Sequence, residues 1–372
     1  FRLPSPSNPL LDDSIKVLNS TITQNAGAGF TTHRLNSGHA YYPQVTMQND
    51  TISNNGGGGV DLNSTTITIS DSTIQGNTGS GISINSDQSI SYVTDNLIDN
   101  NERGLLISGP THVSGNTITN NDSQNVYDNY CDCYGLGGGI AILSGGVIVE
   151  NNQIRNNIAG KGGGIYVSGG GPFEITNNTI ANNQATFSTS GDSKAAGGIF
   201  ASITLYGSAT STISHNTIAG NSAPSGGAAR LSLYTTGATN AFEYNTVTGN
   251  TSTDSDGSTI SLYALGGAEQ AGGTLAYNNI QNNTATYELY LYNSATDPNF
   301  DASSNWWGTT SDTEIQALIY DWNDGDPTRG ILTYSPYLNS PNTTAPPSPP
   351  TNVAAQTGPT TIALSWSANP ES

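Results

Sequence analysis

Two short segments contain clustered Asp residues that could act in acid–base catalysis or bind a metal ion. The segments "DSD" and "DWNDGDP" together contain Asp254, Asp256, Asp321, Asp324 and Asp326. Paired carboxylates can act as acid and base in hydrolysis, and carboxylate-rich loops can bind calcium. Both segments are predicted to be loops, and an EF-hand-type loop would need its closing Glu where Leu265 and Leu332 stand. The five Asp are therefore candidates for an incomplete calcium site, and no other cofactor is indicated.

Sulfur and imidazole groups are too scattered to suggest a metal site. Cys131 and Cys133 form a C-x-C pair in "NYCDCYG", and the four His are spread along the chain. A structural metal site needs further Cys or His ligands at suitable spacing. Cys131 and Cys133 can therefore form a strained local disulfide or remain two free thiols, and no set of metal ligands is predicted.

The charge of the chain limits its partners. There are 28 Asp and Glu against nine Lys and Arg, giving a net charge of −19 over 372 residues. Nucleic acid is an unsuitable partner, because binding phosphates requires a basic surface. No run of about 18 apolar residues occurs, so membrane insertion is not expected. The chain starts at Phe1 with no signal peptide pattern, and we expect a mature or trimmed product.

A short motif recurs along most of the chain, as in "NTITNN", "NNTIANN" and "NNIQNN". Ten copies align on one Ile or Val, and the distances between copies are 30, 22, 24, 20, 36, 26, 38, 29 and 33 residues. In every copy an Asn stands three residues after this apolar residue, and in seven copies another Asn stands two residues before it. The Asn of the first set are Asn25, Asn55, Asn77, Asn101, Asn121, Asn157, Asn183, Asn221, Asn250 and Asn283.

The repeat predicts a parallel β-helix. Segments such as "GGGIAIL", "GGGIYVS" and "GGIFASITLY" alternate apolar residues with period two beside Gly-rich turns, which indicates strands. A unit of about 22 residues with two or three short strands cannot bury its own apolar row, but stacked units can. Coils that stack at about 4.8 Å bring equivalent Asn residues above one another, where their amides can form a ladder. Asn also tolerates the left-handed backbone of a sharp corner.

On these repeats, residues 13–305 resemble the right-handed parallel β-helix superfamily, which includes pectate and alginate lyases, epimerases and many bacterial surface proteins. The resemblance implies an all-β solenoid of about ten or more coils. Polyuronate lyases and epimerases with this fold need a cationic cleft. The candidates here are Lys161 and Lys194, at near-equivalent places in consecutive units, with Arg155 nearby. A solvated surface position for all three is the competing interpretation.

The sequence after the repeats divides into three parts. Segment "NWWG…YSPYL" is similar to C-terminal caps of bacterial β-helix proteins, with a short helix N-capped by Ser311 or Asp312 and with Trp306 and Trp307 closing the core. The last part resembles the first two strands of a fibronectin type III domain, with Trp366 at the position of the core Trp. We expect a leading segment at 1–12, the β-helix at 13–305, its cap at 306–338, a Pro-rich linker at 339–350 and the fibronectin-like fragment at 351–372.

Four Tyr residues suggest a binding surface. Tyr206, Tyr234, Tyr263 and Tyr292 each follow an apolar-x-Leu strand, at spacings of 28, 29 and 29 residues. If the apolar residues face inward, each Tyr faces outward. Four stacked Tyr would suit sugar stacking or a subunit contact, unless inserted loops cover them.

The function expected first is a secreted or cell-surface structural or adhesive rod, with self-association head to tail through its ends and tail. The alternative is a polysaccharide-active lyase or epimerase, or a carbohydrate-binding module. The partners expected are other copies of the chain or extracellular polysaccharide.

Overall fold

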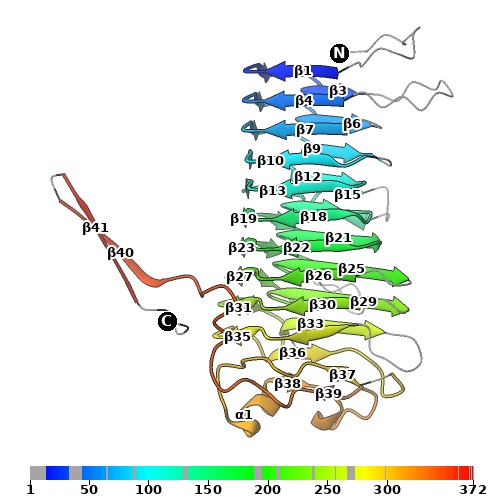
Figure 1. The fold of residues 1–372 in the computed structure, drawn as a ribbon, viewed down its shortest axis with the longest axis vertical. Helices are drawn as coiled ribbons and strands as arrows, with labels where there is room; N and C mark the ends of the chain where they lie inside the picture. Colours follow the sequence, from blue (N-terminus) through cyan, green and yellow to red (C-terminus); the bar gives the residue numbers. More distant parts are fainter. Residues whose placement is uncertain are drawn as a thin grey trace.

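The computed structural model describes most of the chain, and its architecture is a straight rod with a projecting arm (Figure 1). The residues described are 14–32, 44–63, 66–86, 89–128, 133–187, 195–206, 210–236, 239–255, 257–265, 273–297, 299–358, 360–367, 369 and 371.

Three long parallel sheets form the rod, and each coil contributes one strand to each sheet. Sheet A contains β1 (Ser14–Leu18), β4 (Gln44–Gln48), β7 (Thr66–Ser70), β10 (Ser91–Thr94), β13 (Thr111–Ser114), β18 (Val147–Glu150), β22 (Phe173–Thr176), β26 (Thr210–Ser214), β30 (Thr239–Glu243) and β34 (Thr274–Ala276). Sheet B contains β2 (Thr21–Thr23), β5 (Thr51–Ser53), β8 (Thr73–Gln75), β11 (Leu97–Asp99), β14 (Thr117–Thr119), β19 (Gln153–Arg155), β23 (Thr179–Ala181), β27 (Thr217–Ala219), β31 (Thr246–Thr248) and β35 (Asn279–Gln281). Sheet C contains β3 (Phe30–Thr32), β6 (Val60–Asn63), β9 (Ser80–Asn85), β12 (Arg103–Ser108), β17 (Ile140–Ile142), β21 (Ile165–Gly170), β25 (Ile199–Tyr206), β29 (Ala229–Thr236), β33 (Ser258–Leu265), β36 (Tyr287–Leu291) and β38 (Ile319–Tyr320).

The remaining elements are short. Sheet D, between sheets B and C along the chain, contains β20 (Ile158–Ala159), β24 (Gln184–Ala185), β28 (Ser222–Ala223) and β32 (Thr251–Ser252). The two-stranded pairs are β15 (Tyr127–Asp128) with β16 (Cys133–Tyr134), β37 (Phe300–Asp301) with β39 (Leu332–Thr333), and β40 (Thr351–Thr357) with β41 (Ile362–Ser367). The helices described are α1 (Asp312–Ala317) and the 3-10 helix η1 (Trp322–Asp324).

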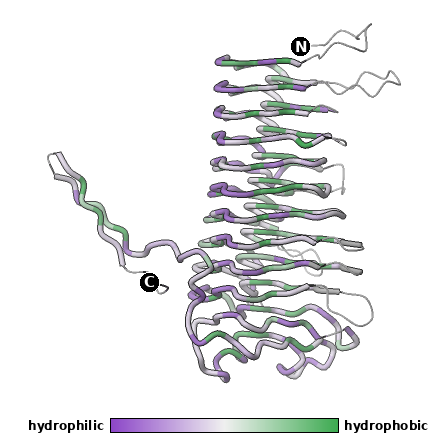
Figure 2. The backbone as a smooth tube through the Cα atoms, in the orientation of Figure 1, coloured by the Kyte–Doolittle hydropathy of each residue, from purple (hydrophilic) through white to green (hydrophobic). Residues whose placement is uncertain are grey.

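One continuous apolar core runs through the coils. The motif residue Ile52 pairs in register with Ile22 on one side and Ile74 on the other, and the same alignment continues through sheet B. Figure 2 shows apolar segments recurring from coil to coil. Each coil thus covers the apolar row of its neighbour, as a solenoid requires. The predicted all-β, parallel β-helix architecture is confirmed.

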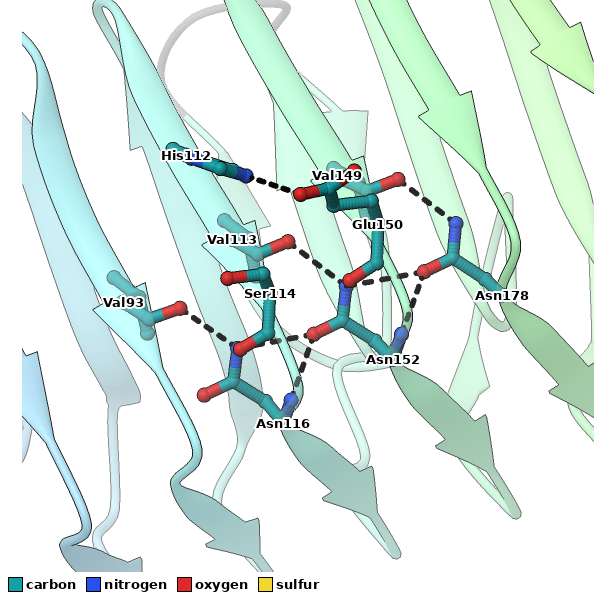
Figure 3. A network of polar contacts seen from close by, with 9 residues as sticks. All are labelled: Val93, His112, Val113, Ser114, Asn116, Val149, Glu150, Asn152 and Asn178. Carbon is teal, nitrogen blue, oxygen red and sulfur yellow. Dashed lines mark hydrogen bonds and ion pairs between the residues drawn. The ribbon is translucent and has the colours of Figure 1, made fainter.

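Two asparagine ladders hold the corners of the coils. We number the ladders by the position of their Asn relative to the motif Ile or Val: the first ladder stands before this residue and the second ladder after it. The second ladder contains the ten Asn listed above, and each amide donates to the Oδ1 atom of the next rung; Asn183 Nδ2 lies 3.0 Å from Asn221 Oδ1. The first ladder follows sheet A and runs through Asn116, Asn152 and Asn178, again with 3.0 Å amide contacts (Figure 3). It ends at Asn305, a rung that the motif alignment does not include.

The left-handed corners use a different Asn from the ladder. Asn177 and Asn182 have φ of 56°, and each directly precedes a ladder residue, Asn178 or Asn183. The motif "NNTIANN" therefore pairs one Asn that turns the chain with one that bonds to the next coil.

The second ladder ends on a buried carboxylate. Each of its amides donates one hydrogen bond to the next rung toward the C-terminal end of the rod, and the last one, Asn283 Nδ2, donates to Glu288 Oε2 at 3.0 Å. Burial raises the pKa of Glu288, while the hydrogen bond from Asn283 acts in the opposite direction. Glu288 supplies the acceptor that the next coil would otherwise provide.

The C-terminal end of the rod carries a cap. Ser311 N-caps α1 by accepting from the Glu314 backbone N–H, and Ile315 is fully buried against the core. Trp307 is 2% exposed and belongs to the core, whereas Trp306 does not. The prediction that both Trp residues close the core was wrong for Trp306, whose indole N–H instead donates to Gln281 Oε1 on sheet B.

Residues 339–348, which we call the strap, follow the cap and dock on the outer face of sheet B. Asn342 N–H donates to Asn279 Oδ1 at 2.7 Å, and Asn279 Nδ2 donates back to the Asn342 carbonyl at 3.0 Å. Thr246 Oγ1 donates to the Pro346 carbonyl. The arm, β40 and β41, leaves the rod beyond the strap (Figure 1). Its apolar side chains are uncovered, and Trp366 is 61% exposed.

Candidate functional site

The outward face of sheet C gathers several aromatic and cationic side chains of the rod. Strand register aligns one outward residue from each coil in a single row across β21, β25, β29, β33, β36 and β38. This row, which we call the aromatic row, consists of Tyr166, Phe200, Arg230, Ser261, Tyr290 and Tyr320. Parallel pairing without register shifts is what brings residues so distant in sequence together.

The N-terminal half of the aromatic row is a small second core. The rings of Tyr166 and Phe200 stack at 5.2 Å between centroids, and both side chains are buried. Leu136 and Ala196, from the segments that precede β17 and β25, cover them. This half of the row stabilises the fold and is not open to a ligand.

The four predicted Tyr residues do not stand one above another. Tyr263 and Tyr292 share one register position, because Leu262 pairs with Leu291. Tyr234 pairs with Leu265, which lies two residues beyond Tyr263, so Tyr234 is displaced by two positions along the strand direction. Tyr206 pairs with Thr236, which lies two residues beyond Tyr234, so Tyr206 is displaced by two more. The expected column is therefore a diagonal on the same face, because a two-residue offset preserves the side of the sheet.

Three of these rings are partly exposed. The side chains of Tyr234, Tyr263 and Tyr292 all have intermediate exposure, and nothing is described of the Tyr206 side chain. Tyr234 and Tyr263 contact each other with ring centroids 5.8 Å apart. We call these three residues the tyrosine diagonal. The Tyr292 hydroxyl is buried, so the diagonal offers partly exposed aromatic rings, which suit a ligand with apolar faces such as a sugar ring.

Two guanidinium groups flank the C-terminal end of the diagonal. The Tyr292 ring has Arg230 at 5.5 Å and Arg329 at 5.3 Å from its centroid. Arg329 also bonds to Asp326 within the cap at 3.2 Å. Its Nη2 donates to the Tyr290 hydroxyl on β36 at 3.3 Å, which ties the cap to sheet C. Hydrogen bonds from Thr328, and to a lesser extent the charge of Arg329, hold the pKa of Asp326 below its usual value. These cation–π contacts fix the orientation of Tyr292.

The cationic catalytic candidates do not form one cluster. Lys161 is half-buried, with Nζ 6.0 Å from the Phe200 centroid, and burial followed by the charge of Arg230 lowers its pKa. Arg155 is exposed on sheet B, a different face of the rod. Lys194 lies outside the described residues. The structure thus leaves Lys161 beside Phe200 and Arg230, away from Arg155.

The cap carboxylates serve local structure. Asp321 is buried and accepts from the backbone N–H groups of Asn323 and Leu332 at 2.8 and 2.9 Å, and Asp324 completes a capping box with it. Asp254 lies in a turn, and Asp256 is outside the described residues. Among the residues that are described, no group of three or more His, Cys, Asp or Glu could hold a metal ion. Cys131 lies outside the description, as does the side chain of Cys133.

Comparison with known proteins places the chain in a family. The model of the right-handed β-helix region matches residues 10–154 and 122–306, and the chain belongs to this family. No curated protein and no solved structure matches the chain. Within the described part of the chain, no helix is both long and apolar enough to cross a membrane.

The sequence reasoning missed Arg230, Arg329 and Tyr290 as the residues that pack around Tyr292, and of these Arg230 and Tyr290 are buried. Arg230 and Arg329 are separated by 99 positions and carry no shared motif. Of the three, only Tyr290 had a sequence pattern that could have revealed it. It is the first Tyr of "LYLYN" and stands two residues before Tyr292, which places both side chains on the same face of a strand.

Proposed function

We propose that this chain is an adhesive β-helix rod that binds an extended polysaccharide on the tyrosine diagonal, outside the cell. The observation that carries the proposal is the set of three partly exposed Tyr rings on consecutive coils, one of them held between two Arg residues. Rings presented by a rigid sheet bind without ordering a loop, so little conformational entropy opposes binding.

The shape of the rod supports this proposal. A parallel solenoid presents an elongated flat surface in which equivalent positions repeat from coil to coil. The diagonal crosses β29, β33 and the end of β36, so a linear chain can contact all three rings at once. A net charge of −19 keeps such a rod soluble, and Arg230 and Arg329 reduce the negative charge locally beside Tyr292.

The binding test uses a panel of neutral and acidic polysaccharides, with affinity gel electrophoresis followed by calorimetry. We expect the double variant Tyr234→Ala/Tyr263→Ala to bind at least about tenfold more weakly, because each truncation removes a central contact ring. Tyr92→Ala is the matched control, because Tyr92 is 42% exposed but belongs to sheet A. The proposal fails if no polysaccharide binds, or if Tyr92→Ala weakens binding equally.

The same panel distinguishes the enzyme alternative. A lyase or epimerase would change the polysaccharide, and the candidate proton acceptor is the half-buried Lys161, whose pKa is lowered and whose Nζ lies 6.0 Å from the Phe200 centroid. If the wild type releases product and Lys161→Ala does not, the function is catalysis and not adhesion. Binding without product release supports the adhesive rod.

Head-to-tail association is a second part of the proposal, and the exposed ends of the molecule support it. Ile15, Val17 and Ile22 in the first described coil pack on the core but are only partly buried. At the other end the arm exposes Val353 and Leu364 at 57% and 61%. Electron micrographs at increasing protein concentration test this part, and isolated monomers under all conditions would contradict it.

A further inference from the structure

One rung of the first ladder is an acid. From Asn96 to Asn305 the rungs are Asn, but the earlier positions are Ser20, Asp50 and Ser72. Asp50 is 2% exposed. Its Oδ1 accepts from the Ser20 backbone N–H at 2.7 Å, and its own N–H donates to Ser72 Oγ at 3.0 Å. Asp50 therefore occupies a ladder position and joins the first coil to the second.

An ionised carboxylate cannot do what the Asn amide does at this position. Asn116 Nδ2 donates to the Val93 carbonyl at 2.8 Å and to the Ser114 carbonyl at 3.0 Å. The strand register puts the carbonyls of Val17 and Gln48 at the corresponding places around Asp50. Asp50 Oδ2 is buried, and none of the described residues forms a hydrogen bond with it. Only a protonated carboxyl group has a hydrogen to donate there.

The surroundings of Asp50 favour the neutral form. Burial raises the pKa of Asp50, while the backbone N–H groups of Ser20 and Gln48 act against this effect. On the neighbouring coils, Lys16 stands on the outward side of β1, and Asp71 is an exposed corner residue that accepts from Gln48 Nε2 at 3.2 Å. Neither of these charged groups is among the causes of the shift, so burial is the main one.

We propose that Asp50 is a proton-dependent rung: when protonated it clamps the first coil onto the second as an Asn would, and when ionised it loosens that coil. The affected elements are β1, β2 and β3, because they pair only with the second coil among the described strands. Loosening them exposes the edges of β4, β5 and β6, which are then free to pair with another chain.

The direction of the pH dependence follows from linkage. A folded-state pKa above the unfolded value means that the folded state holds the proton more tightly. The stabilisation is therefore complete below the unfolded Asp pKa of about 3.9 and is lost as the pH rises through the higher folded value. This is opposite to the usual behaviour of a salt-bridged carboxylate.

Hydrogen exchange followed by mass spectrometry tests the proposal at about pH 4, close to the unfolded Asp pKa of about 3.9, and at about pH 7.5. Protection of peptides from β1 and β2 is divided by that of peptides from β22 and β23 in the same sample, which cancels the pH dependence of chemical exchange. We expect this ratio to fall roughly five- to hundredfold at the higher pH in the wild type, the range for one unpaired buried oxygen.

Asp50→Asn supplies the missing donor at every pH, so we expect its protection ratio to stay high and to lose its pH dependence. Asp71→Asn removes a neighbouring exposed acid and should behave as the wild type does. Protection of β22 and β23 verifies that each variant is folded. A wild-type ratio that does not change with pH would overturn the proposal, as would an Asp50→Asn variant with the pH dependence of the wild type.

Discussion

Replacing Asn183 by Leu is expected to lower the free energy of unfolding by about 3–5 kcal/mol, since a buried donor or acceptor left unpaired costs about 1–3 kcal/mol. Asn183 is fully buried in the middle of the second ladder. Its Nδ2 donates to Ile154 O at 2.9 Å and to Asn221 Oδ1 at 3.0 Å. Its Oδ1 accepts from the side-chain and backbone N–H groups of Asn157. Leu retains none of these four bonds.

Asn25→Leu is the matched control at the end of the same ladder. Asn25 is exposed, and among the described residues its side-chain amide donates only to Asn55 Oδ1, at 2.8 Å. Water can replace that partner, so the expected loss is below about 1 kcal/mol. Urea unfolding followed by circular dichroism gives both values, with hydrogen exchange as a check because long repeat arrays can depart from two-state unfolding. Equal losses for the two variants would contradict a continuous ladder.

Gly164→Val is expected to destabilise the rod by about 3 kcal/mol, because overpacking a tightly packed site forces the backbone to shift. A Cβ atom at Gly164 would lie 2.7 Å from the Gly198 carbonyl, 2.9 Å from Ile180 Cγ2 and 3.0 Å from Asn183 Nδ2. The side chain would therefore push on the core and the ladder at once. The motif Ile and the ladder Asn can both pack closely at this corner only because Gly164 has no side chain.

Gly27→Val is the control for this substitution. A Cβ atom at Gly27 would meet no atom within 4 Å, so a change within about 0.5 kcal/mol is expected. Thermal unfolding of both variants measures the difference. If Gly164→Val were as stable as Gly27→Val, the close packing of Gly164 against Ile180 and Asn183 would be wrong.

The sequence alone was sufficient for the architecture of the rod. The spacing of Ile and Asn in units such as "NNTIANN" predicted the coils, the buried row and the second ladder, because every coil repeats one local solution to the same packing problem. It also predicted a short cap helix N-capped by Ser311 or Asp312, and Ser311 is the N-cap in the structure. These features depend on neighbours in the sequence or on the period of the repeat.

The candidate surface required the tertiary structure. Insertions of different lengths separate the coils, so the sequence spacing of the four Tyr did not give their register, and only strand pairing showed a diagonal. Arg230 from β29 and Arg329 from the cap both contact Tyr292, which follows β36, so only the stacking of the coils brings them together. The sequence shows Asp50 at a position where most copies of the motif have Asn. That its Oδ2 atom is buried without a hydrogen-bond partner among the described residues follows only from the tertiary structure. A repeat specifies which residues are equivalent, whereas the contacts between residues that are not equivalent are decided by how the coils align.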